Sequence, residues 1–298
     1  MPIKSTYLAK GFEDLNGKLV TPDLPGGYSY PLSPTGKCNV LGAPPYHFAG
    51  EEMNIVYQAD PEAVKAFLPY PFEPSLEAPG ECVLHMNSYV SRIADDTLLV
   101  DLPERCNYNE TYLEARCRFK GQETKVYLNF WVNKDFSMLR GWLTGSQKKF
   151  GETEVTFEKC HLFDLNPYLP QVGPGFEIGG MTSAHMEKVV YAKCTLDKLI
   201  TAEELHPAIM MGTNNILIYP DFSMGYKGRE VNKVIHSVCD TWYGDVWQCR
   251  DASIEYYDSV CEEHSMLKPI RIDASYYYKL GFTIYGHIVD YDINKEEN

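Results

Sequence analysis

The sequence predicts a mainly antiparallel β fold, a large β-barrel or a β-sandwich, with a few short helices. Apolar and polar residues alternate over 126–133, which is the period of a strand with one buried face. Few segments have a helical period. Further strands are predicted where β-branched residues and the 22 tyrosines gather, in 188–196, 214–219, 231–241, 252–258 and 276–291.

Residues 1–45 are rich in glycine and proline, which predicts an extended N-terminal arm rather than a folded unit. Such an arm can wrap over its own domain or over a neighbouring subunit. No linker or internal repeat follows, so residues 46–298 are predicted to form a single domain.

Start signals predict two short helices after a strand at 54–57. Asp60 can cap a helix over 60–68, and Pro61 would occupy its first position, where a missing N–H costs nothing. The segment 201–204 begins with threonine and ends with glutamate, which is a capping-box pattern.

The formal net charge of -14 argues against a nucleic-acid partner, because a negative field repels phosphate. Any acidic substrate would need a local positive site. Nine cysteines, an odd number without a CxxC pair, predict free thiols in a reducing cytosol. Neither a signal peptide nor an apolar run of about 20 residues is present, so we expect a cytoplasmic protein without a membrane partner.

One predicted strand, 112–119, has a polar face. Alternation places Glu114 and Arg116 on that face, opposite an apolar face. Two interpretations fit this pattern. The face is either a solvated sheet surface with a cross-paired glutamate and arginine, or a cavity wall where Glu114 handles protons and Arg116 orients it or an anion.

The pair Lys148 and Lys149 lies between glycines at 145 and 151, after an apolar strand. Paired lysines are common on surfaces. A lysine attacks a carbonyl only when it is neutral, and its usual pKa is about 10.4. Burial and a neighbouring ammonium both lower that pKa, so an adjacent lysine in an apolar pocket would activate the first.

The eight histidines lack HxH or HExxH spacing, and no GxSxG elbow occurs. The glycine-rich stretch 173–180 does not lead from a strand into a helix and is predicted to be a loop. We therefore predict no metal and no organic cofactor.

Residues 46–292 resemble the acetoacetate decarboxylase family. The resemblance lies in the order and spacing of several blocks, 54–60, 67–74, 112–114, 146–151, 215–220 and 245–256. It implies a cone-like, double-layered β-barrel with a deeply placed lysine, often assembled into homo-oligomers. In acetoacetate decarboxylase a lysine activated by a neighbouring cation forms a Schiff base with the substrate.

Carried over residue by residue, the resemblance makes Lys148 the Schiff-base lysine, Lys149 the neighbour that lowers its pKa, and Glu114 the catalytic glutamate. His85 falls near a second acidic position of the family and is a further candidate for binding substrate. Three positions depart from the pattern. Gln147 replaces a proline, the segment 140–142 shifts an arginine and lacks a glutamate, and Gly50 replaces an arginine near the active site. We hypothesise that Arg116 substitutes for that arginine in binding substrate.

These residues predict a lyase that acts on a small keto acid, with decarboxylation of a β-keto acid such as acetoacetate as the first interpretation. The same iminium also supports aldol, dehydration or retro-aldol chemistry on pyruvate-like acids, and the arginine missing at Gly50 keeps that alternative open. A third interpretation is a barrel that binds a carbonyl compound without turning it over.

Overall fold

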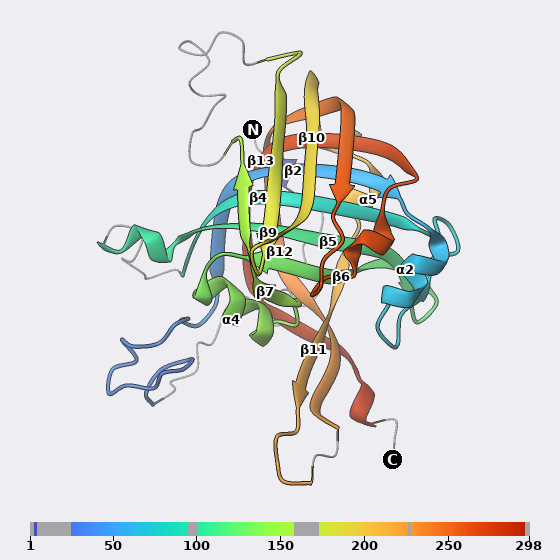
Figure 1. Cartoon of the computed structure of the whole chain (residues 1–298). Helices are drawn as coiled ribbons and strands as arrows, with labels where there is room; N and C mark the ends of the chain where they lie inside the picture. The colour runs from blue at the N-terminus through green and yellow to red at the C-terminus, as the bar shows by residue number, and fades with distance from the viewer. Residues whose placement is uncertain (1–2, 5–24, 94–100, 158–172, 226–227, 296–298) are drawn as a thin grey trace.

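The computed structural model describes residues 3–4, 25–93, 101–157, 173–225 and 228–295. Seven strands pair in a closed circuit, in the order β12, β13, β2, β4, β5, β6, β11 and back to β12 (Figure 1). All neighbours are antiparallel except β6 and β11. The strands are β2 (Tyr46–Gln58), β4 (Glu81–Ile93), β5 (Asn107–Phe119), β6 (Gln122–Val132), β11 (Thr213–Pro220), β12 (Arg229–Tyr256) and β13 (Arg271–Asp292).

A second layer begins at the C-terminal part of β12, residues 246–256, which pairs with β10. This layer covers the outside of the ring. It consists of β10 (Glu187–Ile200), β9 (Glu177–Ala184) and β8 (Glu152–Val155), and β8 lies against β4, β5 and β6. The predicted antiparallel β class is confirmed, and the closed ring with its outer sheet agrees with the double-layered barrel that the resemblance implied.

The short elements lie outside this framework. Ile3–Lys4 (β1) pairs with β12, while residues 25–44 contain turns and bends but no helix or strand. The other short elements are β3 (Glu73–Pro74), β7 (Lys148–Phe150), α2 (Pro61–Phe67), α4 (Asp135–Leu143), α5 (Pro207–Met210), η1 (Pro103–Arg105), η2 (Ala202–Glu204), η3 (His264–Leu267) and η4 (Ile293–Lys295). None of the described helices is long and apolar enough to cross a membrane.

Both predicted helix starts are confirmed. The Asp60 carboxylate accepts a hydrogen bond from the backbone N–H of Glu62 at 3.0 Å, and Pro61 is the first residue of α2. The capping box between Thr201 and Glu204 also forms, although the turn it starts, η2, is a short 3-10 helix.

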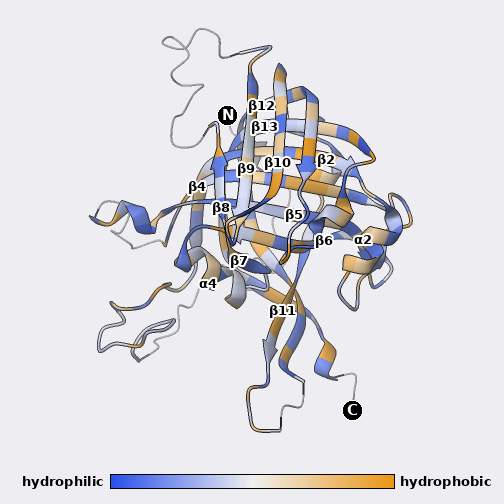
Figure 2. Cartoon of the chain, viewed as in Figure 1, coloured by the Kyte–Doolittle hydropathy of each residue, from blue (hydrophilic) through white to orange (hydrophobic). Residues whose placement is uncertain are grey.

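The main apolar core lies between the two layers, not inside the ring. Apolar and polar residues alternate along the strands (Figure 2). On β5 the fully buried Leu113 and Ala115 belong to the same apolar core as Ile178 and Val190 of the outer sheet. The opposite face of β5 is therefore free to line the interior of the ring with polar groups.

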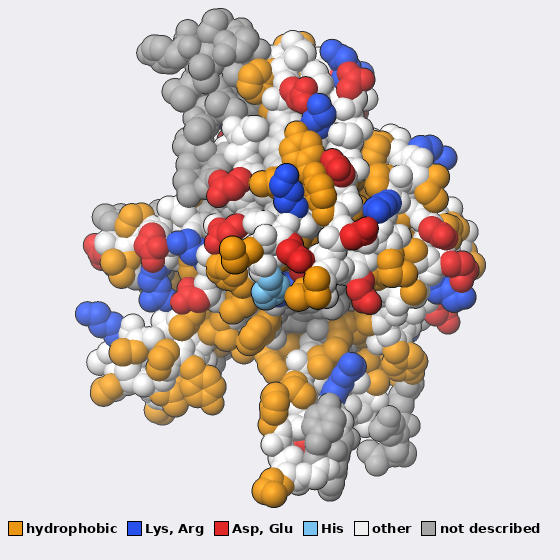
Figure 3. All heavy atoms as spheres, in the orientation of Figure 1, with side chains coloured by type: hydrophobic (Ala, Val, Ile, Leu, Met, Phe, Trp, Pro, Cys, Tyr) orange, Lys and Arg blue, Asp and Glu red, His pale blue; other side chains and the backbone are white. Residues whose placement is uncertain are grey.

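On the face shown in Figure 3, acidic and basic side chains are interspersed rather than segregated. That face therefore offers phosphate no continuous basic surface, in agreement with the net negative charge of the sequence.

Three buried threonine hydroxyls join the layers. Thr111 Oγ1 lies 3.0 Å from Thr153 Oγ1 and 2.6 Å from Thr182 Oγ1. We expect Thr182→Val to reduce the free energy of unfolding by about 1–3 kcal/mol, because it leaves the buried hydroxyls of Thr111 and Thr153 each with one hydrogen-bond partner fewer. Urea unfolding measures this loss, with Thr35→Val at an exposed position as the control. Equal stability of the two variants would show that the hydroxyl cluster does not hold the layers together.

Candidate active site

A cavity of about 240 Å³ lies inside the ring of strands. Its wall consists of side chains that alternate inward from the seven ring strands, closed at one side by α4 and β7. The polar face of 112–119 was open to two interpretations, and Tyr112 and Glu114 lie on the wall of this cavity. Lys148 and His85 line the same cavity, whereas Lys149 and Arg116 do not.

Local structure directs Lys148 into the cavity. β7 runs parallel to β6 and pairs Lys148 with Phe130. The Trp142 indole N–H donates to the backbone oxygen of Lys148 at 2.7 Å, which ties β7 to α4. Gly141 of α4 has no side chain where the stem of Lys148 passes, and a Cβ there would overlap that stem. The glycine at position 141, within the segment that departs from the family pattern, thus allows α4 and the Lys148 side chain to pack closely together.

The Lys148 ammonium is buried beside a glutamate that the sequence analysis did not select. Lys148 Nζ lies 2.6 Å from Glu110 Oε2 and 3.0 Å from Ser137 Oγ, and the residue is 9% exposed. Burial lowers the pKa of Lys148 below its usual 10.5, Glu110 opposes this shift, and the charge of Arg140 adds to it. The net direction favours the neutral amine more than in water.

Lys149 does not face the cavity, because consecutive strand residues point to opposite sides. Its Nζ lies 2.6 Å from Glu262 Oε1. Burial opposes ionisation of Glu262, yet hydrogen bonds from His264, Lys149 and Trp131 hold its pKa at about 2. Lys149 is therefore neutralised by its own partner. The expected role of Lys149 in lowering the pKa of Lys148 is corrected, since Arg140 is the cation that does so.

Arg140 is buried in an aromatic cage at the edge of the cavity. Its guanidinium carbon lies 4.6 Å from the ring centre of Phe48 and 5.3 Å from that of Tyr108. One guanidinium nitrogen, Nη1, donates to Ser91 Oγ at 3.2 Å. The other, Nη2, has no hydrogen-bond partner among the described residues. A buried guanidinium with an open donor on a cavity wall is a ready site for a carboxylate.

Glu114 belongs to a second ion pair of the same cavity. Its Oε2 accepts from Lys125 Nζ at 2.6 Å, and its Oε1 accepts from Thr213 Oγ1 at 2.6 Å. Burial opposes the charge, but Lys125 and His85 lower the pKa of Glu114 to about 2. Glu114 is therefore a fully paired carboxylate, and Glu110, four residues earlier on the same strand face, is the one at the Lys148 nitrogen.

His85 lies between two glutamates. Its Nε2 is 3.0 Å from Glu114 Oε2, and its Nδ1 is 3.7 Å from Glu52 Oε2. Burial alone would lower the pKa of His85, yet the hydrogen bond to Glu114 and the nearby charge of Glu52 raise it above its usual 6.5. Glu52 also accepts from the hydroxyls of Tyr89 and Tyr278.

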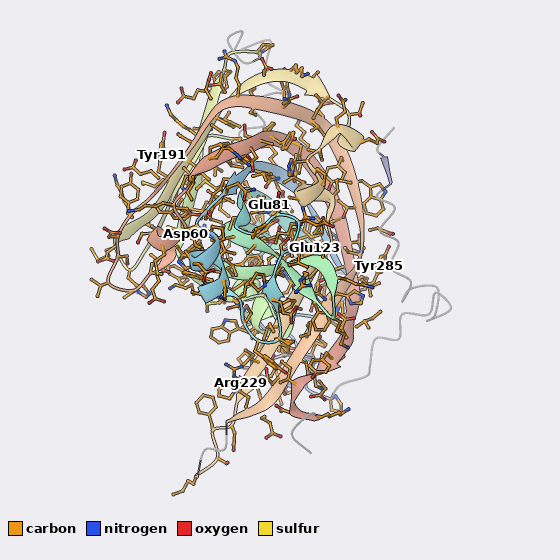
Figure 4. All side chains as sticks on the ribbon, turned by 90° about the vertical axis from the view of Figure 1, so that its right-hand side faces the viewer. Asp60, Glu81, Glu123, Tyr191, Arg229 and Tyr285 are labelled. Carbon is orange, nitrogen blue, oxygen red and sulfur yellow. The ribbon has the colours of Figure 1, made fainter. Side chains whose placement is uncertain are left out.

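Arg116 does not reach the cavity. It forms ion pairs with Glu77, and with Glu81 and Glu123, which are labelled in Figure 4. Its expected role in binding substrate is corrected accordingly. At Gly50 the backbone oxygen of Ser88 and the Tyr89 ring occupy the space that a side chain would need. The guanidinium that the cavity does contain comes from Arg140.

The sequence does not single out Glu110, Arg140 or Lys125 as site residues, although the pattern around the first two indicates their position. Extending the alternation of 112–119 upstream places Glu110 on the face of Glu114. Arg140 lies eight residues before Lys148, in the segment whose shift was noted. Lys125 had no local signal, because only strand pairing brings it to Glu114. Among the described residues, no group of three or more metal-ligating side chains is arranged to hold a metal ion.

The chain belongs to the acetoacetate decarboxylase family, whose model, described as "Acetoacetate decarboxylase (ADC)", matches residues 29–293. Among curated proteins, none matches the sequence.

Solved structures share the fold. The enduracididine biosynthesis enzyme MppR, complexed with the condensation product of pyruvate and imidazole 4-carboxaldehyde, is 26% identical with a TM-score of 0.75, covering 91% of this chain and 98% of MppR. An acetoacetate decarboxylase-like enzyme from Sphingomonas wittichii RW1 is 22% identical with a TM-score of 0.76, covering 88% of this chain and 99% of its own. Acetoacetate decarboxylase from Legionella pneumophila is 16% identical with a TM-score of 0.70, covering 93% and 100%.

The contacts of Lys148 predict which cation controls its pKa. Replacing Arg140 with methionine keeps an apolar stem in the aromatic cage and removes the charge, so the pKa of Lys148 should rise. Lys149→Met should leave the pKa of Lys148 unchanged. The pH dependence of acetylation at Lys148, followed by peptide mass spectrometry, measures the midpoint. A larger shift in Lys149→Met than in Arg140→Met would restore the role first expected of Lys149.

Proposed function

We propose that Lys148 forms an imine with a small keto acid, and that the protein is a lyase working through this imine. The observation that carries the proposal is the buried Lys148 amine, with a lowered pKa, 2.6 Å from Glu110. A buried amine of this kind is the usual nucleophile for ketones. Membership of the acetoacetate decarboxylase family supports an enzyme, and the keto acid fits a cavity of about 240 Å³.

The chemistry assigns one proton to Glu110. Glu110 accepts one proton of the Lys148 ammonium, and the free amine adds to the ketone carbon. A second proton moves from the attacking nitrogen to the former ketone oxygen, which gives a neutral carbinolamine. Glu110 then returns its proton to that hydroxyl, so water leaves and a protonated iminium remains. The iminium withdraws electrons from the bond beside it, which allows either loss of CO₂ from a 3-oxo acid or removal of a proton next to the carbonyl of a 2-oxo acid.

The position of Arg140 separates these two reactions. A carboxylate held by the open Nη2 of Arg140 gains stabilisation in the ground state. Decarboxylation discharges that group, so tight pairing would raise the barrier, whereas a reaction that keeps the carboxylate loses nothing. Sequence reasoning placed decarboxylation first. The geometry favours aldol-type or dehydration chemistry on a 2-oxo acid, with β-keto acid decarboxylation as the alternative. MppR, whose structures hold pyruvate and a pyruvate condensation product, supports this order.

Borohydride trapping tests the imine. We expect the intact mass to increase by one reduced adduct with pyruvate, 2-oxobutanoate or acetoacetate, and Lys148→Met to abolish that increase. Lys149→Gln is the matched control, because its side chain pairs with Glu262 outside the cavity. Absence of an adduct across the whole panel would leave only the interpretation as a binding protein.

Product analysis separates the two reactions. With a 2-oxo acid and an aldehyde, we expect aldehyde consumption without CO₂ release. Arg140→Met should lower kcat/KM for the 2-oxo acid about 10- to 100-fold, the usual effect of losing a hydrogen bond to a charged group. Release of one CO₂ for each acetoacetate consumed, with no aldehyde uptake, would instead establish the decarboxylase.

A further inference from the structure

The cavity contains a second buried ion pair that the imine chemistry does not use. Lys125 Nζ and Glu114 Oε2 are 2.6 Å apart, and Lys125 and Glu114 are 3% and 2% exposed. Glu110 and Glu114 lie four residues apart on one face of β5, which separates their α-carbons by about 13 Å. A short keto acid bound at Lys148 therefore leaves the surroundings of Lys125 unoccupied. We call these surroundings, lined by Lys125, Tyr112, Tyr127 and Tyr243, the distal compartment.

Aromatic rings line the path between the two ion pairs. The Phe130 ring centre is 5.1 Å from Lys148 Nζ. Tyr112 stacks on Phe130 at 4.7 Å and on His85 at 4.0 Å. A ligand that extends from the imine along this wall meets flat apolar surfaces first, which suits an apolar or aromatic chain.

Charge determines what the end of that chain can carry. Lys125 and a protonated His85 face the carboxylates of Glu114 and Glu52, so the four charges sum to zero. With His85 neutral the sum is negative. Neither state offers a surplus positive charge, so a second carboxylate on the ligand would be buried without compensation.

Hydrogen-bond donors, in contrast, are in surplus. Tyr112, Tyr127 and Tyr243 line the cavity, and their hydroxyls form no hydrogen bond to another described residue. Burial raises the pKa of all three, so each keeps its proton and can donate. Hydroxyl donors without an acceptor favour an oxygen on the ligand, and the lack of surplus positive charge favours an uncharged one.

We propose that the distal compartment binds an uncharged hydroxyl or carbonyl group at the end of an apolar or aromatic chain joined to the carbonyl carbon at Lys148. This inference rests on the proposed function for the position of that carbon. It extends the substrate from a keto acid of a few carbons to a long keto acid with an oxygen at its far end.

Four 2-oxobutanoates test the distal compartment. They are the parent acid and its 4-phenyl, 4-(4-hydroxyphenyl) and 4-(4-carboxyphenyl) derivatives. The rate of borohydride-trapped adduct at low ligand concentration is the measurement. We expect the hydroxyphenyl acid to react about 10-fold faster than the phenyl acid, the usual yield of one or two hydrogen bonds, and the carboxyphenyl acid to react more slowly than both.

The variant Tyr127→Phe/Tyr243→Phe removes only two hydroxyls and leaves both rings. We expect it to reduce the ratio of hydroxyphenyl to phenyl rates from about 10 to about 1. Tyr191→Phe, on the outer strand β10 (Figure 4), is the matched control and should leave the ratio unchanged. A ratio near 1 in the unmodified protein, or a ratio that the double variant does not change, overturns the proposal.

A ligand without a ketone separates this inference from the imine. Binding of 4-(4-hydroxyphenyl)butanoate to Lys148→Met, followed by calorimetry, should be weakened about 10-fold by the tyrosine double variant. If that weakening occurs while no ketone forms an adduct, the distal compartment stands and the proposed function fails. If adducts form but the analogue binds equally to both proteins, the proposed function stands and the distal compartment is overturned.

Discussion

A lysine side chain is buried in a protein either as an ammonium whose charge a carboxylate compensates or as a neutral amine. The surroundings of Lys148 support both forms. Glu110 lies 2.6 Å from its nitrogen, while burial and the charge of Arg140 lower its pKa. Burial and Arg140 act against Glu110, and the net effect lowers the pKa of Lys148. The arrival of a substrate carboxylate would change the charges around the amine and, with them, where the proton resides.

The two-layer architecture makes such a cavity possible. The main apolar core lies between the ring and the outer sheet, where Leu113 and Ala115 meet the outer strands. The interior of the ring is consequently free to hold two ammonium–carboxylate pairs, each at 2.6 Å. In a β-barrel of a single layer, the interior would have to supply the core itself.

The departures from the family pattern are related to one another. Tyr89 packs over Gly50 and donates to Glu52, so no arginine fits on β2 at that point. α4 supplies Arg140, whose guanidinium packs against Phe48 of β2, and Gly141 lets the stem of Lys148 pass. The guanidinium of the cavity therefore comes from a helix rather than from the first ring strand, although it lies against that strand.

The sequence by itself determined the β class, the start of α2, the capping box and the outward apolar face of β5, because each depends on neighbours along the chain. It also singled out Lys148 and Glu114, although it attributed the lowering of the Lys148 pKa to burial and Lys149, whereas burial and Arg140 lower it. Only the tertiary structure decided that Glu110 and Arg140 surround Lys148, that Lys149 pairs with Glu262, and that Lys125 meets Glu114. These contacts join residues from different elements, and strand pairing and burial, which local periodicity does not encode, bring them together.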